Sequence, residues 1–166
     1  MKKRFIFSLL APLLAEALFA ADVFASPAGY GPDWKVVVSI DEQKTYVYKK
    51  DQLVRQMLCS TGLLDGDNDT PLGDYVINES GQKRGTSFFS KRFNEGARWW
   101  VGFIGGVYLF HSVPVDANDR IIPEEAALLG KPASHGCIRL SMDDAKWFYD
   151  TVPDGAKLHI QKEAEK

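Results

Sequence analysis

Three short segments near the start of the chain constrain its fold most, because each is rich in residues that favour β-strands. They read WKVVVSID (34–41), KTYVYKK (44–50) and QLVRQMLCSTG (52–62), and only short polar stretches separate them. Connections of this length suit hairpins and are too short for a helical crossover. The three segments therefore predict consecutive antiparallel strands.

The remainder of the chain predicts further strands and two short helices. Gly, Asp, Asn and Pro are dense in 62–73, which indicates a loop, and 80–97 has so little periodicity that we expect a long irregular excursion. The other expected elements are a strand at 74–77, two strands within 97–115 around Gly105-Gly106, a helix from Pro123 to Leu129, a helix from Ser141 to Tyr149 and a last strand at 157–160. Because 45% of the residues are apolar and 12% aromatic, we predict one mostly β domain at 34–161, followed by a tail at 162–166.

Residues 1–25 have the order of a secretory signal: a basic start, an apolar run and then small residues. The apolar run at 5–15 is too short to span about 30 Å of hydrocarbon at ~1.5 Å per residue. We predict cleavage before Ser26; cleavage after Ala20 and an uncleaved anchor are the alternatives. Residues 26–33, rich in Pro and Gly, then form a short linker. The mature domain is expected in the cell envelope, in the periplasm or wall space, without a stable membrane span.

The charge of the chain argues against one class of partner. Its formal net charge is −2, and its basic residues do not form the clustered face that binds nucleic acid. We therefore expect no nucleic-acid partner.

The chain has two cysteines, Cys59 and Cys137, and the residues alone leave three interpretations open. The two thiols can form a disulfide in an exported protein, although Cys59 lies in an apolar strand pattern typical of a small buried residue. A metal could be held by His111, His135 and Cys137, but zinc sites usually show tight ligand pairs, and His111 lies far upstream of the other two. The third interpretation is that Cys137 is a nucleophile.

The nucleophile interpretation rests on the sequence SHGCIRL at 134–140. A free thiol has a pKa of about 8.5, so a neighbouring imidazole is needed to take its proton at neutral pH. Gly136 leaves room for a carbonyl to approach the sulfur, and consecutive backbone N–H groups in such a turn can hold a developing oxyanion. The triplet His-Gly-Cys is not specific by itself.

Together with its surroundings, the motif resembles the L,D-transpeptidase catalytic domain (YkuD family). The resemblance is carried by SHGCIRL, by YLFHSVP (108–114) before it, by DDAKWFYDTVPDGAKLHI (143–160) after it, and by STG (60–62) and DTPLGDYVI (69–77) near the start. It covers most of 34–161. The resemblance implies a single β-sandwich or barrel domain with two short helices, which acts on peptidoglycan stem peptides without a metal or organic cofactor.

Three residues match the catalytic positions of this family. Cys137 matches the nucleophile, and His111 matches the histidine that activates the thiol and later carries the proton. Ser112 matches a position whose backbone or hydroxyl orients that histidine; several family members have glycine there. Nucleophile, base and orienting group form a common catalytic arrangement.

The rest of the motif is expected to bind the oxyanion or the substrate. Ser134, His135 and Gly136 complete it, and we assign the backbone N–H groups near Gly136 and Cys137 to the oxyanion hole. His135 is expected to be structural more often than chemical, as is the remote His159. Arg139 is expected either to pair with a substrate carboxylate or to make a structural hydrogen bond to a neighbouring loop.

The resemblance implies an exported transpeptidase that forms a Cys137 thioester with loss of D-Ala and then makes 3→3 cross-links. It also implies that carbapenems acylate Cys137. The alternatives are an L,D-carboxypeptidase that uses water, attachment of a protein amine to the wall, and a non-catalytic wall-binding domain locked by a Cys59–Cys137 disulfide.

Two features depart from the compact members of the family. The loop at 113–133 is long, and its predicted helix could form a lid. The chain also shows no recognisable wall-binding module, so substrate affinity is expected to come from the catalytic domain. Phe88, Phe89 and Phe93 are expected either to line a groove there or to pack in the core.

Overall fold

The computed structural model describes residues 31–79 and 84–165. The predicted signal peptide at 1–25 and most of the predicted linker lie outside the described residues, so both remain predictions. Within the described residues, no helix is both long and apolar enough to cross a membrane.

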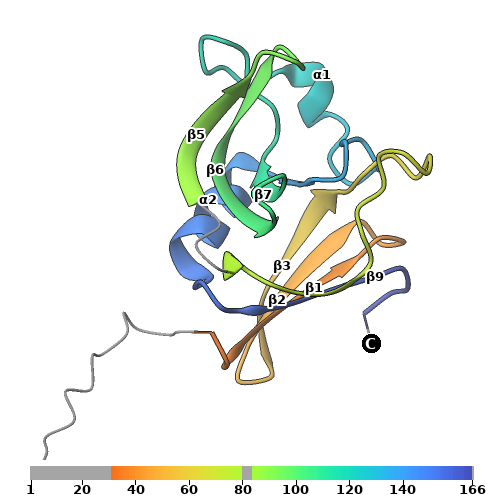
Figure 1. The fold of residues 1–166 in the computed structure, drawn as a ribbon, viewed down its shortest axis with the longest axis vertical. Coiled ribbons are helices and arrows are strands. Elements are labelled where there is room, and N and C mark those ends of the chain that lie inside the picture. The colour runs from red at the N-terminus through yellow and green to blue at the C-terminus, as the bar shows by residue number, and fades with distance from the viewer. Residues whose placement is uncertain (1–30, 80–83, 166) are drawn as a thin grey trace, which may run out of the picture.

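The described residues form a curled sheet of nine strands with two helices (Figure 1). The strands are β1 (Trp34–Ser39), β2 (Lys44–Lys49), β3 (Gln52–Ser60), β4 (Gly73–Val76), β5 (Arg84–Ser90), β6 (Glu95–Ile104), β7 (Tyr108–Ser112), β8 (Ile138–Leu140) and β9 (Lys157–Gln161), and the helices are α1 (Pro123–Ala126) and α2 (Met142–Thr151). Their order in the sheet is β4-β9-β1-β2-β3-β8-β7-β6-β5. The prediction of one mostly β domain with two short helices is confirmed, and the sheet curls into a half-barrel.

The predicted meander β1–β2–β3 is confirmed, and its last turn explains its register. Lys50 and Asp51 have φ angles of 49° and 59°, as in a two-residue type I′ turn, whose twist matches that of the flanking strands. β3 then joins the two halves of the sheet, because it pairs with β2 over most of its length and with β8 at Cys59 and Ser60.

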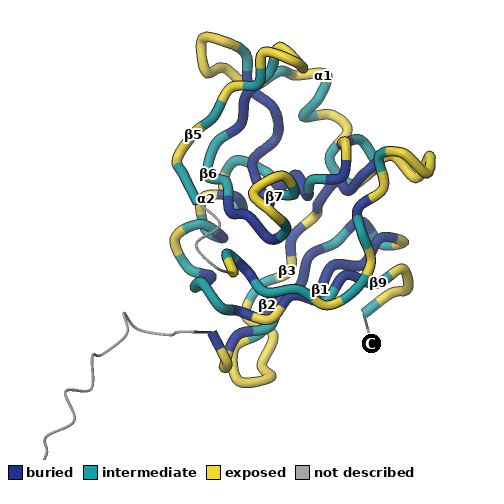
Figure 2. The backbone as a smooth tube through the Cα atoms, in the orientation of Figure 1, coloured by how far each residue is buried: buried dark blue, intermediate teal, exposed yellow. Residues whose placement is uncertain are grey.

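Helix α2 packs under the second half of the sheet and holds β7 and β8 in place. Ser141 caps its start by accepting a hydrogen bond from the Asp144 amide at 3.0 Å. Phe148 of α2 stacks on Phe110 of β7 with ring centroids 4.4 Å apart, and both side chains are fully buried. Burial of each ring contributes about 1.5–3 kcal/mol. Figure 2 shows this buried interior beneath exposed loops and hairpin tips.

The expectation of an irregular excursion at 80–97 is wrong for the described part of that segment. β5 and β6 form an antiparallel hairpin in which Ser90 faces Glu95 and Phe88 faces Ala97. β5 is an edge strand whose residues are all at least partly exposed, so it lacks the alternation of apolar and polar residues by which strands are usually predicted. The short strand β8 was also not predicted, and α1 is shorter than the expected helix from Pro123 to Leu129.

Candidate active site

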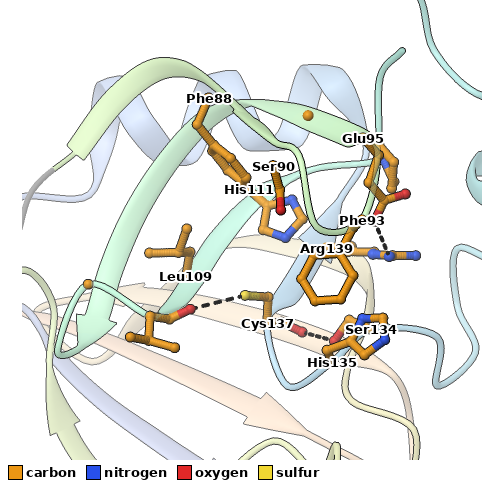
Figure 3. A pocket seen from close by; sticks show the side chains of 14 residues that line it. Phe88, Ser90, Phe93, Glu95, Leu109, His111, Ser134, His135, Cys137 and Arg139 are labelled. Atoms are coloured by element: carbon orange, nitrogen blue, oxygen red, sulfur yellow. Dashed lines mark hydrogen bonds and ion pairs between the residues drawn. The ribbon is translucent and has the colours of Figure 1, made fainter. Parts of the chain in front are cut away.

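The parallel pair β7–β8 brings the two main predicted residues to one cavity. In its register Phe110 lies beside Ile138 and His111 beside Arg139, and Cys137 immediately precedes β8. A cavity of about 260 Å³ is lined by both Cys137 and His111 (Figure 3). Of the other predicted site residues, Ser134, His135 and Arg139 line this cavity, whereas Ser112 and Gly136 do not.

Gly136 is required by the shape of the turn that presents Cys137. Its φ is +104°, and a Cβ atom added to it would lie 2.5 Å from the Tyr108 ring, so any other residue would be strained. The Gly136 carbonyl accepts a hydrogen bond from the Thr70 hydroxyl at 2.9 Å, and that hydroxyl accepts one from the Gly62 amide at 2.8 Å. The early motifs STG and DTPLG thus support the turn directly.

Ser134 braces the same turn from the inside. Its hydroxyl donates to the Cys137 carbonyl at 2.5 Å and accepts from the Gly136 amide at 3.1 Å. The Gly136 N–H is therefore already engaged, and of the two N–H groups predicted for the oxyanion hole the one on Cys137 remains. Ser134 shapes the loop through these two contacts.

His111 is held in one orientation by a backbone carbonyl. Its Nδ1 lies 2.7 Å from the Ser112 carbonyl oxygen; since a carbonyl only accepts, Nδ1 carries the proton and Nε2 is left as an acceptor. The Ser112 hydroxyl is used elsewhere, because it donates to the Val113 carbonyl and accepts from the Arg98 amide. A residue without a hydroxyl could orient His111 in the same way.

The electrostatics of the cavity favour an uncharged thiol and an uncharged imidazole. Burial lowers the pKa of His111 to about 4, partly opposed by the Ser112 carbonyl and assisted by the charge of Arg139. Burial also raises the pKa of the Cys137 thiol, opposed by the Leu109 amide and Arg139. The thiol lies 3.5 Å from the Val107 carbonyl, to which it can donate. This arrangement suits removal of the thiol proton during attack by a neutral base rather than a preformed ion pair.

Arg139 is enclosed by carboxylates of the chain itself. It is 4% exposed. Its Nη1 lies 2.5 Å from Glu125 Oε2 on α1, and its Nη2 lies 3.3 Å from Glu95 Oε1 on β6. Of the two roles expected for Arg139, the contact with neighbouring segments is the one present. Its positive charge still acts on the site, because it lowers the pKa of both His111 and Cys137.

Aromatic residues of the β5–β6 hairpin form the outer wall of the cavity. Phe88 contacts the edge of His111, with ring centroids 5.8 Å apart, and Phe93 stacks on the exposed His135 at 4.4 Å. Both line the cavity, whereas Phe89 does not. His159 lies outside it, on β9, and pairs with Asp74 of β4 at 2.7 Å.

Sequence reasoning did not identify Glu95, Val107 or Leu109, which also line the cavity. Glu95 lies two residues before the predicted start of its strand, in the segment 80–97 that was expected to be irregular. The other two act through backbone groups, which leave no signature in residue type. No pattern in the sequence could have singled them out.

Both cysteines are free thiols, so the Cys59–Cys137 disulfide is contradicted. Cys59 is completely buried on β3 beside Leu140 of β8, and burial raises its pKa to about 12. Residues 31–79 and 84–165 contain no group of three His, Cys, Asp or Glu side chains placed to hold a metal ion.

Comparison with known proteins gives one family. The sequence model of the L,D-transpeptidase catalytic domain (YkuD) matches residues 33–160. A protein of Bacillus subtilis (strain 168), named "Putative L,D-transpeptidase YciB", is 41% identical over 125 residues, which are 74% of this chain and 63% of that relative.

Solved structures share the fold at lower identity. The LD transpeptidase LdtMt1 in complex with imipenem matches with a TM-score of 0.63 and 21% identity, over 78% of this chain and 59% of that one. L,D-transpeptidase 3 from Mycobacterium tuberculosis, in complex with a faropenem-derived adduct, matches with a TM-score of 0.62 and 23% identity, over 80% and 61%. In each comparison the chain spans less than two thirds of the relative's length.

Proposed function

The chain belongs to the L,D-transpeptidase catalytic domain family (YkuD), and on that basis we propose that it cross-links peptidoglycan stem peptides through a thioester on Cys137. The observation that carries the proposal is the pairing of a partly exposed thiol with a neutral, oriented imidazole in one cavity. That pairing supplies both the nucleophile and the base that acyl transfer needs. We further propose that the protein is exported and works in the bacterial cell envelope.

The first step forms the thioester. His111 Nε2 takes the thiol proton as Cys137 attacks the carbonyl between the third residue of a tetrapeptide stem and its D-Ala. The Cys137 N–H stabilises the oxyanion. The imidazolium then protonates the departing amine, the C–N bond breaks, and D-Ala leaves.

The second step transfers the acyl group. The side-chain amine of another stem attacks the thioester carbonyl, forms a 3→3 amide bond and restores the Cys137 thiol. This scheme needs no metal or organic cofactor. The two free thiols argue against a non-catalytic wall-binding domain, because that alternative depends on a disulfide.

The test is product analysis with a disaccharide-tetrapeptide. The purified protein and its Cys137→Ala variant are incubated with this substrate, and products are identified by mass spectrometry. A cross-linked dimer that lacks one D-Ala, absent with the variant, is the expected result. Tripeptide as the sole product would replace the proposal with L,D-carboxypeptidase activity, and identical results with both proteins would refute Cys137 catalysis.

We also propose that carbapenems acylate Cys137. The related fold that was solved with imipenem supports this, as does the partial exposure of Cys137. Intact mass of the protein after exposure to imipenem reads the adduct directly, and Cys137→Ala is the control.

A further inference from the structure

Glu95 places a carboxylate in the wall of the catalytic cavity, at the opposite end from Leu109 (Figure 3). Its position is fixed by the backbone on either side. Asn94 has a φ of 54° in the turn of the β5–β6 hairpin. Gly96 exchanges two hydrogen bonds with Val115, at 2.8 and 2.9 Å. Glu95 is therefore held at the cavity by two separate segments.

The cluster around Glu95 carries more negative than positive charge. Within the described residues, its ion-paired groups are one cation, Arg139, and two carboxylates, Glu95 and Glu125. Glu125 holds Arg139 at 2.5 Å and does not line the cavity, whereas Glu95 lies at 3.3 Å and does. The side chain of Glu95 is 22% exposed. Glu125 thus neutralises the charge of Arg139, and the carboxylate of Glu95 can still accept hydrogen bonds from a ligand in the cavity.

The surroundings of Glu95 strengthen the electrostatic effect of its negative charge. The cavity wall nearby is largely apolar, with Phe88, Phe93 and Pro114, and a charge acts more strongly where water is limited. A ligand group that suits this position is a cation with N–H donors, since a carboxylate is an acceptor only.

The proposed reaction supplies such a group in the side-chain amine of the acceptor stem, which is an ammonium ion in water. We infer that Glu95 binds this ammonium group and takes one of its protons, so that the Glu95 end of the cavity is the acceptor side. This inference rests on the proposed transpeptidase function.

The proton transfers balance. The ammonium gives one proton to the Glu95 carboxylate and becomes a neutral amine. The amine attacks the thioester carbonyl, its C–N bond forms, and the C–S bond breaks with its electron pair on sulfur. The second amine proton passes through His111 to the thiolate, which restores the thiol, and Glu95 then releases its proton to solvent.

The environment of Glu95 suits a proton acceptor. Burial raises the pKa of Glu95, and the negative charge of Glu125 raises it further, whereas Arg139 and His135 lower it. These three groups are the charged or titratable neighbours that face Glu95, from β8, from α1 and from the loop before β8. A carboxylate with a raised pKa is a stronger base than a free one.

The test separates acceptor use from acylation. Glu95→Gln keeps the size of the side chain and an oxygen for Arg139, and removes the charge. Glu124→Gln is the matched control, because Glu124 is exposed on α1 next to Glu125 and does not line the cavity. Three quantities are measured on the full chain: the rate of Cys137 acylation by imipenem, the apparent KM for the acceptor amine, and the ratio of cross-linked product to tripeptide.

For Glu95→Gln we expect acylation within about twofold of the parent, an acceptor KM raised about tenfold and a product ratio lowered about tenfold, the scale of one charge-assisted hydrogen bond. Glu124→Gln should match the parent in all three. The parent should also prefer an amine to a hydrazide of equal length, which is neutral at pH 7, and Glu95→Gln should lose that preference.

Two results overturn the inference. An unchanged acceptor KM and product ratio would show that Glu95 does not bind the acceptor. An equal loss in acylation and in acceptor use would show a structural role only. Absence of acylation in the parent itself would refute the proposed function first, and is distinguished from these by the Cys137→Ala control.

Discussion

The two free thiols of this protein have opposite surroundings, although Cys59 lies on β3 and Cys137 immediately precedes β8, the strand that pairs with β3. Cys59 is completely buried on β3, and burial raises its pKa to about 12. Cys137 is partly exposed and lines a cavity, where the Leu109 amide and Arg139 oppose the effect of burial on its pKa and His111 offers a neutral acceptor nitrogen. The difference shows that reactivity here depends on a base and an open approach to the sulfur, not on the thiol alone.

Replacing each cysteine by alanine should give the largest difference in cross-linking activity between two variants. Cys137→Ala should lower cross-linking by at least about 10³-fold, because Cys137 is the one cysteine that lines the cavity and a serine hydroxyl is far less nucleophilic than a thiol at neutral pH. Cys59→Ala should keep the parent rate. Product formation from a disaccharide-tetrapeptide measures both, with circular dichroism as the check on folding. Comparable losses in the two variants would remove the distinction between the thiols.

Removal of the base should reduce the difference in reactivity between Cys137 and Cys59 without abolishing it. His111→Gln should lower the rate of Cys137 acylation by imipenem about 10²-fold at pH 7. The parent rate should depend little on the state of His111 above pH 4, since its pKa is about 4. The variant rate should instead rise with pH as thiolate forms. A variant with the parent's pH profile would exclude His111 as the base.

The burial of His111 should also make stability depend on pH. Its pKa is about 4 in the folded protein and about 6.5 when unfolded, so the unfolded chain binds more protons between these values. Stability should be full above pH 6.5 and fall by on the order of 3 kcal/mol as pH drops to 4. Urea unfolding across this range measures it, and His111→Gln should remove that part of the slope. If the free energy of unfolding of the variant depends on pH as in the parent, that dependence arises from groups other than His111.

A polar substitution at Cys59 should affect stability and leave chemistry intact. Cys59→Ser places a hydroxyl at a site without solvent exposure, which should cost about 1–3 kcal/mol in free energy of unfolding. The acylation rate at Cys137 should remain within about twofold of the parent. Slower acylation in a fully folded variant would show that the two sites are coupled through β3 and β8.

The parts predictable from sequence were those that local residue type determines. The β1–β2–β3 meander followed from β-branched residues and short connections, and the motif at 134–140 indicated Cys137 as the candidate nucleophile. The β5–β6 hairpin could not be predicted in this way, because β5 is an edge strand whose residues are all at least partly exposed. Glu95 acquires its place because its neighbour Gly96 is hydrogen-bonded to Val115 and its own carboxylate pairs with Arg139, and both partners are distant in sequence.

Site roles that depend on backbone groups were also beyond the sequence. Ser112 was expected to orient His111 by backbone or hydroxyl, and only the structure distinguishes them, because the carbonyl contacts Nδ1 and the hydroxyl contacts Val113 and Arg98. The sequence also left Arg139 between two roles, because its partners are side chains that are distant in sequence. Its partners come from β6 and α1, and their position depends on the whole fold.

The most direct test of this account is site-resolved mass spectrometry of the protein after brief exposure to imipenem, followed by digestion. We predict one adduct, on the peptide that contains Cys137, with the Cys59 peptide unmodified and no adduct in Cys137→Ala. An adduct on Cys59, or none on Cys137 in folded protein, would contradict the claim that Cys137 is the reactive thiol.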